Sequence, residues 1–351
     1  MRLSLVSRCY NFQSMKTHRR GFLGLAGAMA AAAAPQPVRT AVYGVGHAHA
    51  RSKIRVLRAL PQFDLVGVCP RDVPERFSEI AGPAVSKLSP SQILDDPSIQ
   101  LVAVEAHVGV NLAFAHEAID AGKFVHLDKS PGADLTSLQD LFRKATAKKL
   151  VVQMGYMWRY HSAMRQAVDM ALAGDLGRVY MIRTTINKPM SAEARLPLAA
   201  FKGGMMFEMG GHMIDRIVEV LGPPARVQGR LRHDGPFDDG LADNTLAVFE
   251  FDRAMAEVYV AALQPNGNAY RTFEILGTKG TATVQPFAPD GHLSLDTGVG
   301  RKDLRVEIAA PSYETDFIEL AGVIRGERTP RYSFTHDLAV QRTLLEICGM
   351  L

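Results

Sequence analysis

Short apolar segments alternate with helical segments from Val38 onward, and this alternation restricts the fold more than any other feature of the chain. Two strands joined through a helix form a parallel pair, because a parallel connection must cross over the sheet. The sequence therefore predicts a parallel sheet with helices on both faces over residues 38–156. Its strands are expected at 38–43, 63–69, 101–105, 124–127 and 151–155, and its helices at 50–59, 112–121 and 135–148.

The pattern changes after residue 156, where strands begin to follow one another without helices between them. Successive strands joined by turns indicate an antiparallel sheet. We therefore expect a second, α+β domain over residues 157–351, with a large, mostly antiparallel open sheet and a C-terminal helix able to pack back on the first domain. Its strands are expected at 179–184, 226–232, 245–251, 256–263, 272–276, 281–286 and 304–308, and its helices at 162–173, 206–221, 315–325 and 337–348.

Residues 1–34 have the pattern of a twin-arginine signal segment. Arg19 and Arg20 precede a mild apolar run from Phe22 to Ala34, which is too short to span a bilayer. We expect this segment to direct the folded protein through the twin-arginine export machinery to the periplasm, with its cofactor already bound. A disordered tail is the alternative.

Charge and cysteine content argue against a nucleic-acid-binding protein and against a protein held together by disulfides or a metal. The chain carries 40 basic and 36 acidic residues, but five of the basic residues and none of the acidic ones fall in residues 1–34. The remainder is close to neutral, which argues against a nucleic-acid-binding surface. Cys69 and Cys348, the two cysteines beyond that segment, form no disulfide framework and have no metal-type spacing, so we expect no metal site.

A Gly-x-Gly turn, Gly44-Val45-Gly46, follows the first expected strand and precedes a helix. The first glycine permits the tight turn, and the second lets the backbone approach a pyrophosphate that the helix N-terminus attracts. His47 and Ala48 are expected beside the same cofactor. His49 stands where the usual fingerprint has a third glycine, so an ordinary turn is the alternative. The position in an alternating α/β pattern favours a Rossmann dinucleotide-binding domain.

The end of the second expected strand bears on the choice of cofactor. An acid there usually binds the adenosine ribose, but Pro70 occupies its place in Cys69-Pro70-Arg71-Asp72. Arg71 could pair with a 2′-phosphate, which favours NADP slightly over NAD. The alternatives are that Arg71 is a solvated loop charge and that Asp72 serves NAD.

Lys129 lies in Asp128-Lys129-Ser130-Pro131, just beyond the carboxyl end of an expected parallel strand. Ligands of such sheets bind at that edge. A lysine in this place can reach both a nicotinamide ribose and a substrate hydroxyl. Its charge would stabilise a forming alkoxide.

Glu208, His212 and Asp215 are spaced four and three residues apart, so a helix over 206–221 would present all three on one face. A carboxylate one turn from an imidazole can fix the histidine tautomer and raise its basicity. The alternative is an exposed helix face with a chance histidine.

Taken in order, these features resemble the glucose–fructose oxidoreductase/inositol dehydrogenase (Gfo/Idh/MocA) family over residues 38–351. Besides the Gly-x-Gly turn, four segments carry the resemblance. They are 121–130, like the family's AGKHV…EKP; 156–161, like its aromatic-and-arginine segment; 203–215, like its GGG…D-x-x-x-H-x-x-D helix; and 273–280, like its GTKG turn. Five matches in the same order are specific, whereas each alone is weak.

The resemblance implies an NAD(P)-dependent oxidoreductase that acts on a CH–OH group of a sugar or polyol. It assigns His212 as the general base, Glu208 as the residue that orients His212, and Lys129 as the group that steadies the oxyanion and contacts the nicotinamide ribose. It also implies that Tyr156, Arg159 and Asp215 bind substrate. A structural charge at the domain junction is an equal alternative for Arg159.

The departures from the family pattern concern mainly the cofactor. Asp128 and Ser130 replace the family's Glu and Pro, and Glu208 replaces its Asp. Glu105 begins a segment where the family has a Thr-Pro pair against the cofactor, so we expect Glu105 beside the nucleotide. These changes leave the implied catalytic residues in place.

Two other functions remain open at this stage. One is the same fold with a tightly held, internally recycled nucleotide that performs redox-assisted elimination or glycoside cleavage. The other is a non-catalytic exported sugar-binding protein. For the oxidoreductase, the resemblance implies that the open sheet of the second domain also builds a homodimer or homotetramer.

Overall fold

The computed structural model describes residues 35–285, 291–306 and 312–351. The expected twin-arginine segment lies outside these residues. The residues from Gln36 onward form one compact unit that contains both sheets. Among the described residues, no helix combines the length and the apolar character needed to cross a membrane.

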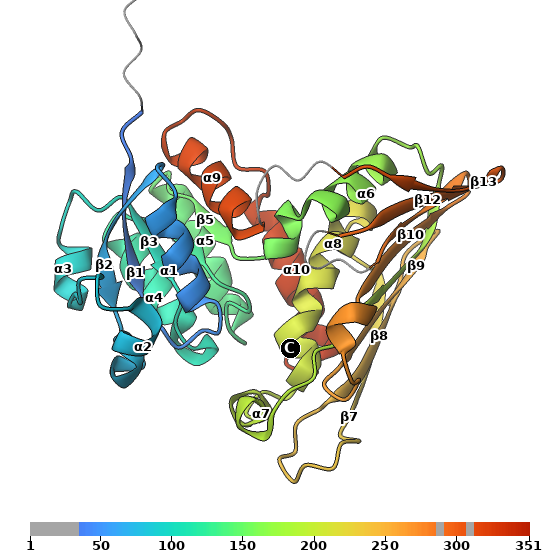
Figure 1. The fold of residues 1–351 in the computed structure, drawn as a ribbon, viewed down its shortest axis with the longest axis horizontal. Coiled ribbons are helices and arrows are strands. Elements are labelled where there is room, and N and C mark those ends of the chain that lie inside the picture. The colour runs from blue at the N-terminus through green and yellow to red at the C-terminus, as the bar shows by residue number, and fades with distance from the viewer. Residues whose placement is uncertain (1–34, 286–290, 307–311) are drawn as a thin grey trace, which may run out of the picture. The chain divides into compact units, whose positions relative to one another are not determined.

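The first sheet confirms the predicted parallel α/β architecture (Figure 1). Its five strands lie in the order β2-β1-β3-β4-β5, and all pairs are parallel. Their bounds are β1 Val38–Tyr43, β2 Phe63–Cys69, β3 Leu101–Val104, β4 Phe124–Leu127 and β5 Val152–Met154. The chain order reverses between β1 and β3, so the carboxyl ends of these two strands flank the place where such sheets bind ligands.

Helices join these strands, because each parallel connection must return over the sheet. They are α1 Ala50–Ala59, α2 Phe77–Ala81, α3 Pro90–Leu94, α4 Val108–Asp120 and α5 Leu135–Ala147. The two short helices α2 and α3 were not expected from the sequence. Helix α4 begins at Val108, four residues before its expected start at 112.

The second sheet confirms the prediction of a large, mostly antiparallel sheet. It has eight strands in the order β13-β12-β11-β10-β6-β9-β8-β7, and only the pair β6–β9 is parallel. The bounds are β6 Val179–Thr185, β7 Arg226–Arg232, β8 Asn244–Glu250, β9 Met255–Ala261, β10 Thr272–Gly277, β11 Gly280–Val284, β12 Leu293–Thr297 and β13 Gly300–Leu304. The hairpin β12–β13 replaces the strand expected at 304–308, of which residues 307 and 308 lie outside the described residues.

Five further helices complete the fold: α6 Ser162–Leu172, α7 Ala192–Ala199, α8 Gly211–Leu221, α9 Ser312–Ile324 and α10 Phe334–Ile347. Helix α10 packs between α8 and α5, and its Phe334 ring stacks on Phe142 of α5 with the centroids 4.4 Å apart. The amide of Gln341 on α10 also donates to the carbonyl oxygen of Gly132, 2.7 Å away. The C-terminal helix therefore contacts the layer of the parallel sheet.

The helix expected at 206–221 is not uniform. Met206–Gly210 forms a π-helical turn, and the α-helix α8 begins only at Gly211. A π-turn holds more residues per turn than an α-helix and so rotates the residues before it relative to those after it. The i, i+4 spacing of Glu208 and His212 therefore does not place their side chains one above the other.

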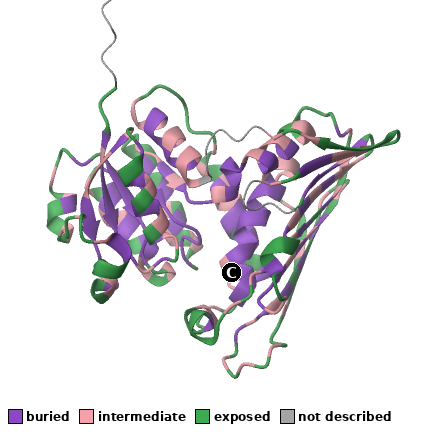
Figure 2. Ribbon diagram, in the orientation of Figure 1, coloured by how far each residue is buried: buried purple, intermediate pink, exposed green. Residues whose placement is uncertain are grey.

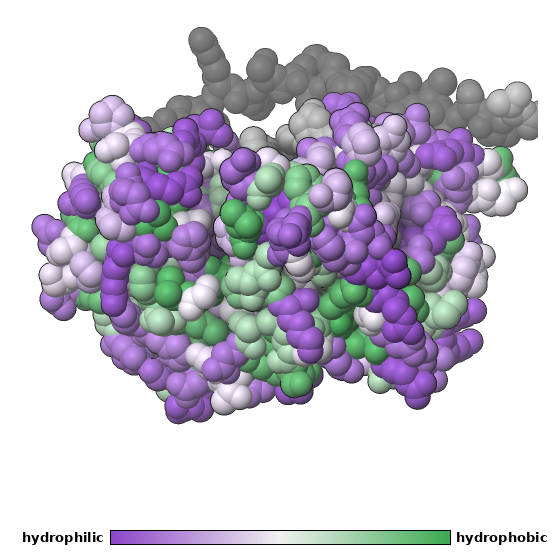
Figure 3. All heavy atoms as spheres, turned by 90° about the horizontal axis from the view of Figure 1, so that it is seen from below, coloured by the Kyte–Doolittle hydropathy of each residue, from purple (hydrophilic) through white to green (hydrophobic). Residues whose placement is uncertain are grey.

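The two sheets differ in how they are buried (Figure 2). Strands β1 and β3 are buried on both faces, since helices cover the parallel sheet. Along β8, buried and exposed residues alternate, so one face of the large sheet packs on α6 and α8 while the other stays open. In the view from below, hydrophobic residues gather near the middle of the molecular face and hydrophilic residues surround them (Figure 3).

Two neighbouring residues of β8 provide a test of this one-sided burial. Phe249 is fully buried, whereas Val248 is 38% exposed. Phe249→Ala should lower the free energy of unfolding by about 3–5 kcal/mol, because it removes a large buried ring and leaves a cavity. Val248→Ala, the matched control, should cost less than about 1 kcal/mol. Urea titration of both variants would check the difference, and equal losses would contradict the assigned faces.

Candidate active site

The Gly-x-Gly turn connects β1 to α1 as predicted. Gly44 has φ +87°, and a Cβ atom there would lie 2.4 Å from the Cβ of Ala106 at the end of β3. Its N–H donates to the carbonyl oxygen of Cys69 at 2.8 Å. Only glycine meets both the conformation and the space. The turn thereby brings the ends of β1 and β3 together.

A carboxylate already occupies the N–H groups of this turn. Asp72 accepts hydrogen bonds from the backbone N–H of Val45, Gly46 and His107, at 2.9, 3.0 and 2.9 Å. A Cβ atom on Gly46 would lie 2.5 Å from an Asp72 oxygen. The second glycine therefore permits close approach of an anionic group, and in this structure that group is Asp72.

Glu105 does not face the turn, which corrects its expected place beside the cofactor. Its side chain is fully buried and pairs with Lys53 of α1 at 3.0 Å. Only its carbonyl oxygen reaches the turn, where it accepts the N–H of His47 at 2.9 Å. A carboxylate inside an α/β layer requires a buried cation, and Lys53 supplies it.

Asp128 is the centre of this buried group of charges. Its carboxylate lies 2.7 Å from Lys53 Nζ, 3.0 Å from His47 Nδ1 and 3.1 Å from His49 Nδ1. Burial alone would raise the pKa of Asp128, but His47, Lys53 and His49 hold it well below the ordinary value. Asp128 therefore stays ionised and fixes two imidazoles at the start of α1.

Arg71 is not free to receive a 2′-phosphate. Its guanidinium donates to Glu117 of α4 at 2.7 Å and to the hydroxyl of Tyr43, and it lies 5.0 Å from the centre of the Phe114 ring. Glu117 neutralises the charge that the NADP expectation required. This pairing favours a structural role for Arg71 over the expected cofactor role.

Lys129 and Glu208 meet at the carboxyl end of β4. Lys129 Nζ lies 3.0 Å from a carboxylate oxygen of Glu208 and donates to its carbonyl oxygen at 3.0 Å. Ser130, joined to Lys129 by a cis peptide, donates to the carbonyl oxygen of Phe207 at 2.9 Å. Burial alone would raise the pKa of Glu208, but Lys129 holds it below the ordinary value. The pair is therefore an ion pair of two charged groups.

His212 lies close enough to Lys129 to feel its charge. Burial, Lys129 and His49 hold the pKa of His212 well below its usual value, so the imidazole is neutral near pH 7. Among the described residues, its buried Nδ1 has no hydrogen-bond partner, so it forms no hydrogen bond with Glu208. Glu208 therefore contacts Lys129 and not His212, because the π-turn separates the two side chains.

Tyr156 is packed against His212 as a wall of the same region. The two rings meet edge to face with centroids 6.0 Å apart, and the buried hydroxyl of Tyr156 has no hydrogen-bond partner in the part of the chain that the structure describes. Burial is the main cause that raises the pKa of this hydroxyl. An unpartnered buried hydroxyl is costly, so it is available to a ligand that enters here.

Arg159 and Asp215 belong to a buried ion cluster instead of a binding surface. Arg159 donates to Asp215 at 2.9 and 2.6 Å and pairs with Asp337 of α10. Asp215 also accepts from Arg216 and from His336 at 2.9 Å. Arg159 and Asp215 are 1% and 0% exposed and paired with each other, which favours the structural alternative for Arg159 and a structural role for Asp215 over the expected substrate role.

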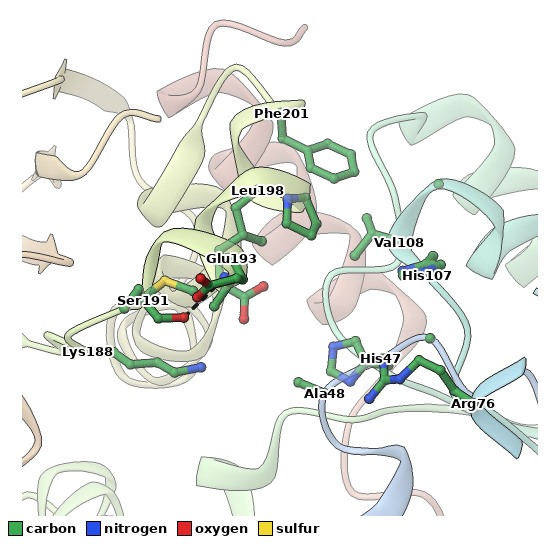
Figure 4. A pocket seen from close by; sticks show the side chains of 16 residues that line it. His47, Ala48, Arg76, His107, Val108, Lys188, Ser191, Glu193, Leu198 and Phe201 are labelled. Atoms are coloured by element: carbon green, nitrogen blue, oxygen red, sulfur yellow. Dashed lines mark hydrogen bonds between the residues drawn. The ribbon is translucent and has the colours of Figure 1, made fainter. Parts of the chain in front are cut away.

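A cavity of about 700 Å³ opens beside the Gly-x-Gly turn. Figure 4 shows His47, Ala48, Arg76, His107 and Val108 on one side and Lys188, Ser191, Glu193, Leu198 and Phe201 on the other. Glu208 also lines it, whereas Lys129 and His212 are 1% and 2% exposed. The ammonium of Lys129 thus lies one side chain behind the cavity wall.

The residues at this cavity fit a nicotinamide dinucleotide in their chemistry. The N–H groups of the turn bind a carboxylate oxygen, so they have the geometry for an anion, and Gly46 leaves room for one. Gly44, Gly46, His47 and Ala48 would hold the nucleotide, and Lys129 would face its reacting end. Asp72 must then yield the N–H groups or turn to the ribose.

Two groups offer metal-ligating atoms among the described residues: His47, His49 and Asp128, and Asp215, His336 and Asp337. Each already contains a full positive charge at hydrogen-bond distance, from Lys53 in the first and from Arg159 in the second. Lys53 and Arg159 would repel a metal cation bound at either place.

Sequence reasoning did not identify Lys53, Arg76 or Lys188. The sequence could have indicated a buried cation such as Lys53, because an acid such as Glu105 at the end of a buried strand requires a positive charge nearby. Arg76 and Lys188 lie in segments without a motif, and only the packing of the chain brings them to the cavity.

Comparisons with known proteins agree with this architecture. Residues 162–283 match the family model of the GFO/IDH/MocA C-terminal domain. The scyllo-inositol 2-dehydrogenase (NAD(+)) of Bacillus subtilis is 25% identical over 310 residues, which are 84% of this chain and 88% of the relative. The dTDP-3,4-didehydro-2,6-dideoxy-alpha-D-glucose 3-reductase of Actinomadura kijaniata is 24% identical over 214 residues, which are 60% of this chain and 64% of the reductase. The chain spans 41% and 54% of the length of two other curated oxidoreductases.

A solved oxidoreductase from Agrobacterium radiobacter, in complex with NAD+, L-tartaric acid and magnesium, has the same fold. The TM-score is 0.74 at 14% identity, over 89% of this chain and 96% of that one. At this identity the likeness establishes the fold alone.

The buried charges predict a pH dependence of stability. Burial alone would lower the pKa of His126, but its pairing with Asp316 at 2.9 Å raises it above the ordinary value of about 6.5. A raised folded-state pKa stabilises the fold fully below the unfolded-state pKa, and the contribution is lost as pH rises through the folded-state pKa. His126→Gln, which can keep a hydrogen bond but not the charge, should therefore lose more stability at pH 6 than at pH 9. Urea titrations at both pH values would check this, and a larger loss at pH 9 would contradict the assignment.

Proposed function

We propose that this chain, whose residues 162–283 match the GFO/IDH/MocA C-terminal domain, transfers a hydride between a nicotinamide and a hydroxyl-bearing carbon of a sugar or sugar derivative. The domain match and the oxidoreductase relatives support this family and an oxidoreductase role with a nicotinamide cofactor. The observation that carries the proposal is the convergence of Lys129, Glu208 and a neutral His212 beside a cavity that begins at a Gly-x-Gly turn.

In this proposal the nicotinamide supplies the hydride chemistry, and the protein binds, orients and moves protons. The turn from Gly44 to Ala48 holds the nucleotide. Lys129 stabilises the negative charge that develops on the substrate oxygen, since its ammonium is fixed and almost dehydrated. Glu208 holds that ammonium in place.

His212 serves as the proton acceptor during oxidation. A general base must be unprotonated at the working pH, and burial near Lys129 keeps this imidazole neutral. Its free Nδ1 leaves one nitrogen without a protein partner. The sequence predicted that Glu208 orients His212. In this proposal the ring of Tyr156, which packs against His212, orients it instead.

A polyhydroxylated substrate is consistent with the relatives, whose names include an inositol dehydrogenase and a nucleotide-sugar reductase. The cavity offers both polar and apolar side chains to such a molecule. Met190, Leu198 and Phe201 contribute apolar surface, and Ser191 and Lys188 contribute donors.

For the cofactor we propose NAD in preference to NADP, which revises the slight preference drawn from Arg71. Glu117 neutralises Arg71, whereas Asp72 presents an ionisable carboxylate at the end of β2. A carboxylate there can accept from a ribose hydroxyl and would repel a 2′-phosphate.

We also propose that the protein is exported to the periplasm and forms a homodimer or homotetramer. Export rests on Arg19 and Arg20, which lie outside the described residues. Self-association is supported by Leu246, Val248 and Met255, which are 37%, 38% and 55% exposed on the outer face of the large sheet. Apolar side chains on an open sheet face favour contact with another subunit.

His212→Ala tests the catalytic proposal. Turnover should fall by about 10²–10⁴-fold because the proton acceptor is removed, while nucleotide binding is retained. The wild-type rate of oxidation should also hold until the pH falls well below 6.5, since only then does His212 become protonated. Steady-state rates and fluorescence titration of bound nucleotide would check both results.

His292, which is distant from the cavity and pairs with Asp303, provides the control for that variant. His292→Ala should leave turnover unchanged. Unaltered turnover in His212→Ala would remove His212 from the mechanism.

The cofactor proposal predicts opposite results for two adjacent residues. Asp72→Asn should reduce the preference for NAD over NADP by about tenfold or more, because it removes the charge that repels a 2′-phosphate. Arg71→Gln, the control, should leave the ratio of the two dissociation constants within about twofold of the wild type. Calorimetric titration with both nucleotides would decide. A selective loss of NADP affinity in Arg71→Gln would restore the original assignment.

A further inference from the structure

Two buried or partly buried cations beside the cavity have no carboxylate partner. Lys188 lines the cavity, and Arg271 is 9% exposed. Within the described ranges, neither side chain forms an ion pair with an aspartate or glutamate. Most cations of this chain that are buried to this degree have one, as Lys53, Arg159 and Arg195 do. A buried charge without a partner is costly, so its retention points to a ligand.

The two cations lie near each other, because Arg271 Nε donates to the carbonyl oxygen of Asn187, the residue before Lys188. Burial lowers the pKa of Lys188, Glu208 opposes this effect, and Lys129 and Arg271 add to it. Since Glu208 is already in ion-pair contact with Lys129 at 3.0 Å, it does not fully neutralise Lys188 as well. Arg271 adds a further positive charge on the side of Lys188.

The backbone around Lys188 is firmly held. Asn187 is 1% exposed, its side-chain oxygen accepts the N–H of Ala261 at 2.7 Å, and its amide donates to Gln264 at 2.6 Å. Its carbonyl oxygen accepts from Arg271 Nε at 3.1 Å. The N–H of Lys188 donates to the carbonyl oxygen of Ala261 at 3.0 Å. The Lys188 side chain therefore projects from a fixed base, unlike a lysine on a surface loop.

The position of Lys188 separates it from the nucleotide end of the cavity. In Figure 4 its ammonium points into the cavity from the side of Ser191 and Glu193, opposite His47, Ala48 and Arg76. The Gly-x-Gly turn, with its own N–H donors, lies on that opposite side. An anion at Lys188 therefore belongs to the second ligand of the cavity and not to the pyrophosphate. Glu193, the other carboxylate on this side, is exposed at the first turn of α7.

We propose that the substrate of this site is an acidic sugar, whose anionic group, a carboxylate or a phosphate, is received by Lys188 with Arg271 behind it. The inference deepens the proposed function and rests on it, since it names the substrate class of the same cavity. Binding the anion neutralises the excess charge and places the remaining hydroxyls toward Lys129. Charge-assisted hydrogen bonds of this kind discriminate strongly, because a neutral analogue leaves the cations unpaired.

Matched sets of sugars test the proposal. Glucose, glucuronate and glucose 6-phosphate differ only at C6, as do galactose, galacturonate and galactose 6-phosphate. With NAD present, at least one acid of a set should bind tenfold or more tighter than its neutral parent, measured by calorimetry. The carboxylate and phosphate arms tell the two anion sources apart. No measurable binding of any acid to the wild type, or equal binding of acid and parent, would overturn the proposal.

Variants assign the effect to the two cations. Lys188→Met should reduce the ratio of acid affinity to neutral-parent affinity by tenfold or more while leaving affinity for NAD unchanged. Lys188→Arg should recover most of it, and Arg271→Lys, which keeps the charge, should lose less than Arg271→Met. Lys144→Met removes a lysine that pairs with Asp120 on the surface and should change nothing.

The outcomes separate this inference from the redox proposal. A loss of NAD affinity in Lys188→Met, with acid preference retained, would show a cofactor residue and sink the inference. Acid binding through Lys188 without reduction of NAD by any sugar would leave the anion site standing and contradict the redox function. Turnover of neutral sugars at rates equal to those of the acids would leave the redox function standing and contradict the acidic-sugar inference.

Discussion

The ion pair between Lys129 and Glu208 is the contact on which the candidate site depends. Lys129 follows a strand of the parallel sheet, and Glu208 lies in the π-turn that precedes α8. Their contact at 3.0 Å fixes an ammonium, almost without water, beside a cavity that begins at the Gly-x-Gly turn. A charge held in this way costs no reorganisation when a substrate oxygen becomes negative, which is the condition for electrostatic catalysis.

A second group of buried charged side chains, centred on Asp128, lies next to this ion pair. Asp128, adjacent to Lys129, holds His47 and His49 while Lys53 balances Asp128 and Glu105. The residues that depart from the family pattern are thus coupled to one another. Lys53 accompanies Glu105 in the interior, since an unpaired buried carboxylate would be costly.

Helix α8 carries both a residue of the proposed catalytic group and a residue of the buried ion cluster. His212 and Asp215 come from the same helix, yet the first has a free nitrogen near Lys129 and the second is surrounded by Arg159, Arg216 and His336. Asp215 instead ties α8 to α10, which carries His336. The sequence predicted that Arg159 and Asp215 bind substrate. We propose instead that Lys188 and Arg271, which belong to the second sheet and its connections, bind it.

The sequence by itself determined the two sheets, most strand positions and the turn at Gly44, because these follow from the local periodicity of apolar residues and from the φ angles that glycine permits. It also indicated Lys129 and His212, through spacing within motifs. Tertiary structure alone decided which charges meet. Glu208 contacts Lys129 instead of His212 because a π-turn changes the helical register, and Glu105 turns inward because Lys53 of another element reaches it. Lys188 and Arg271 belong to no motif and are joined by sheet packing, so no local pattern could have paired them.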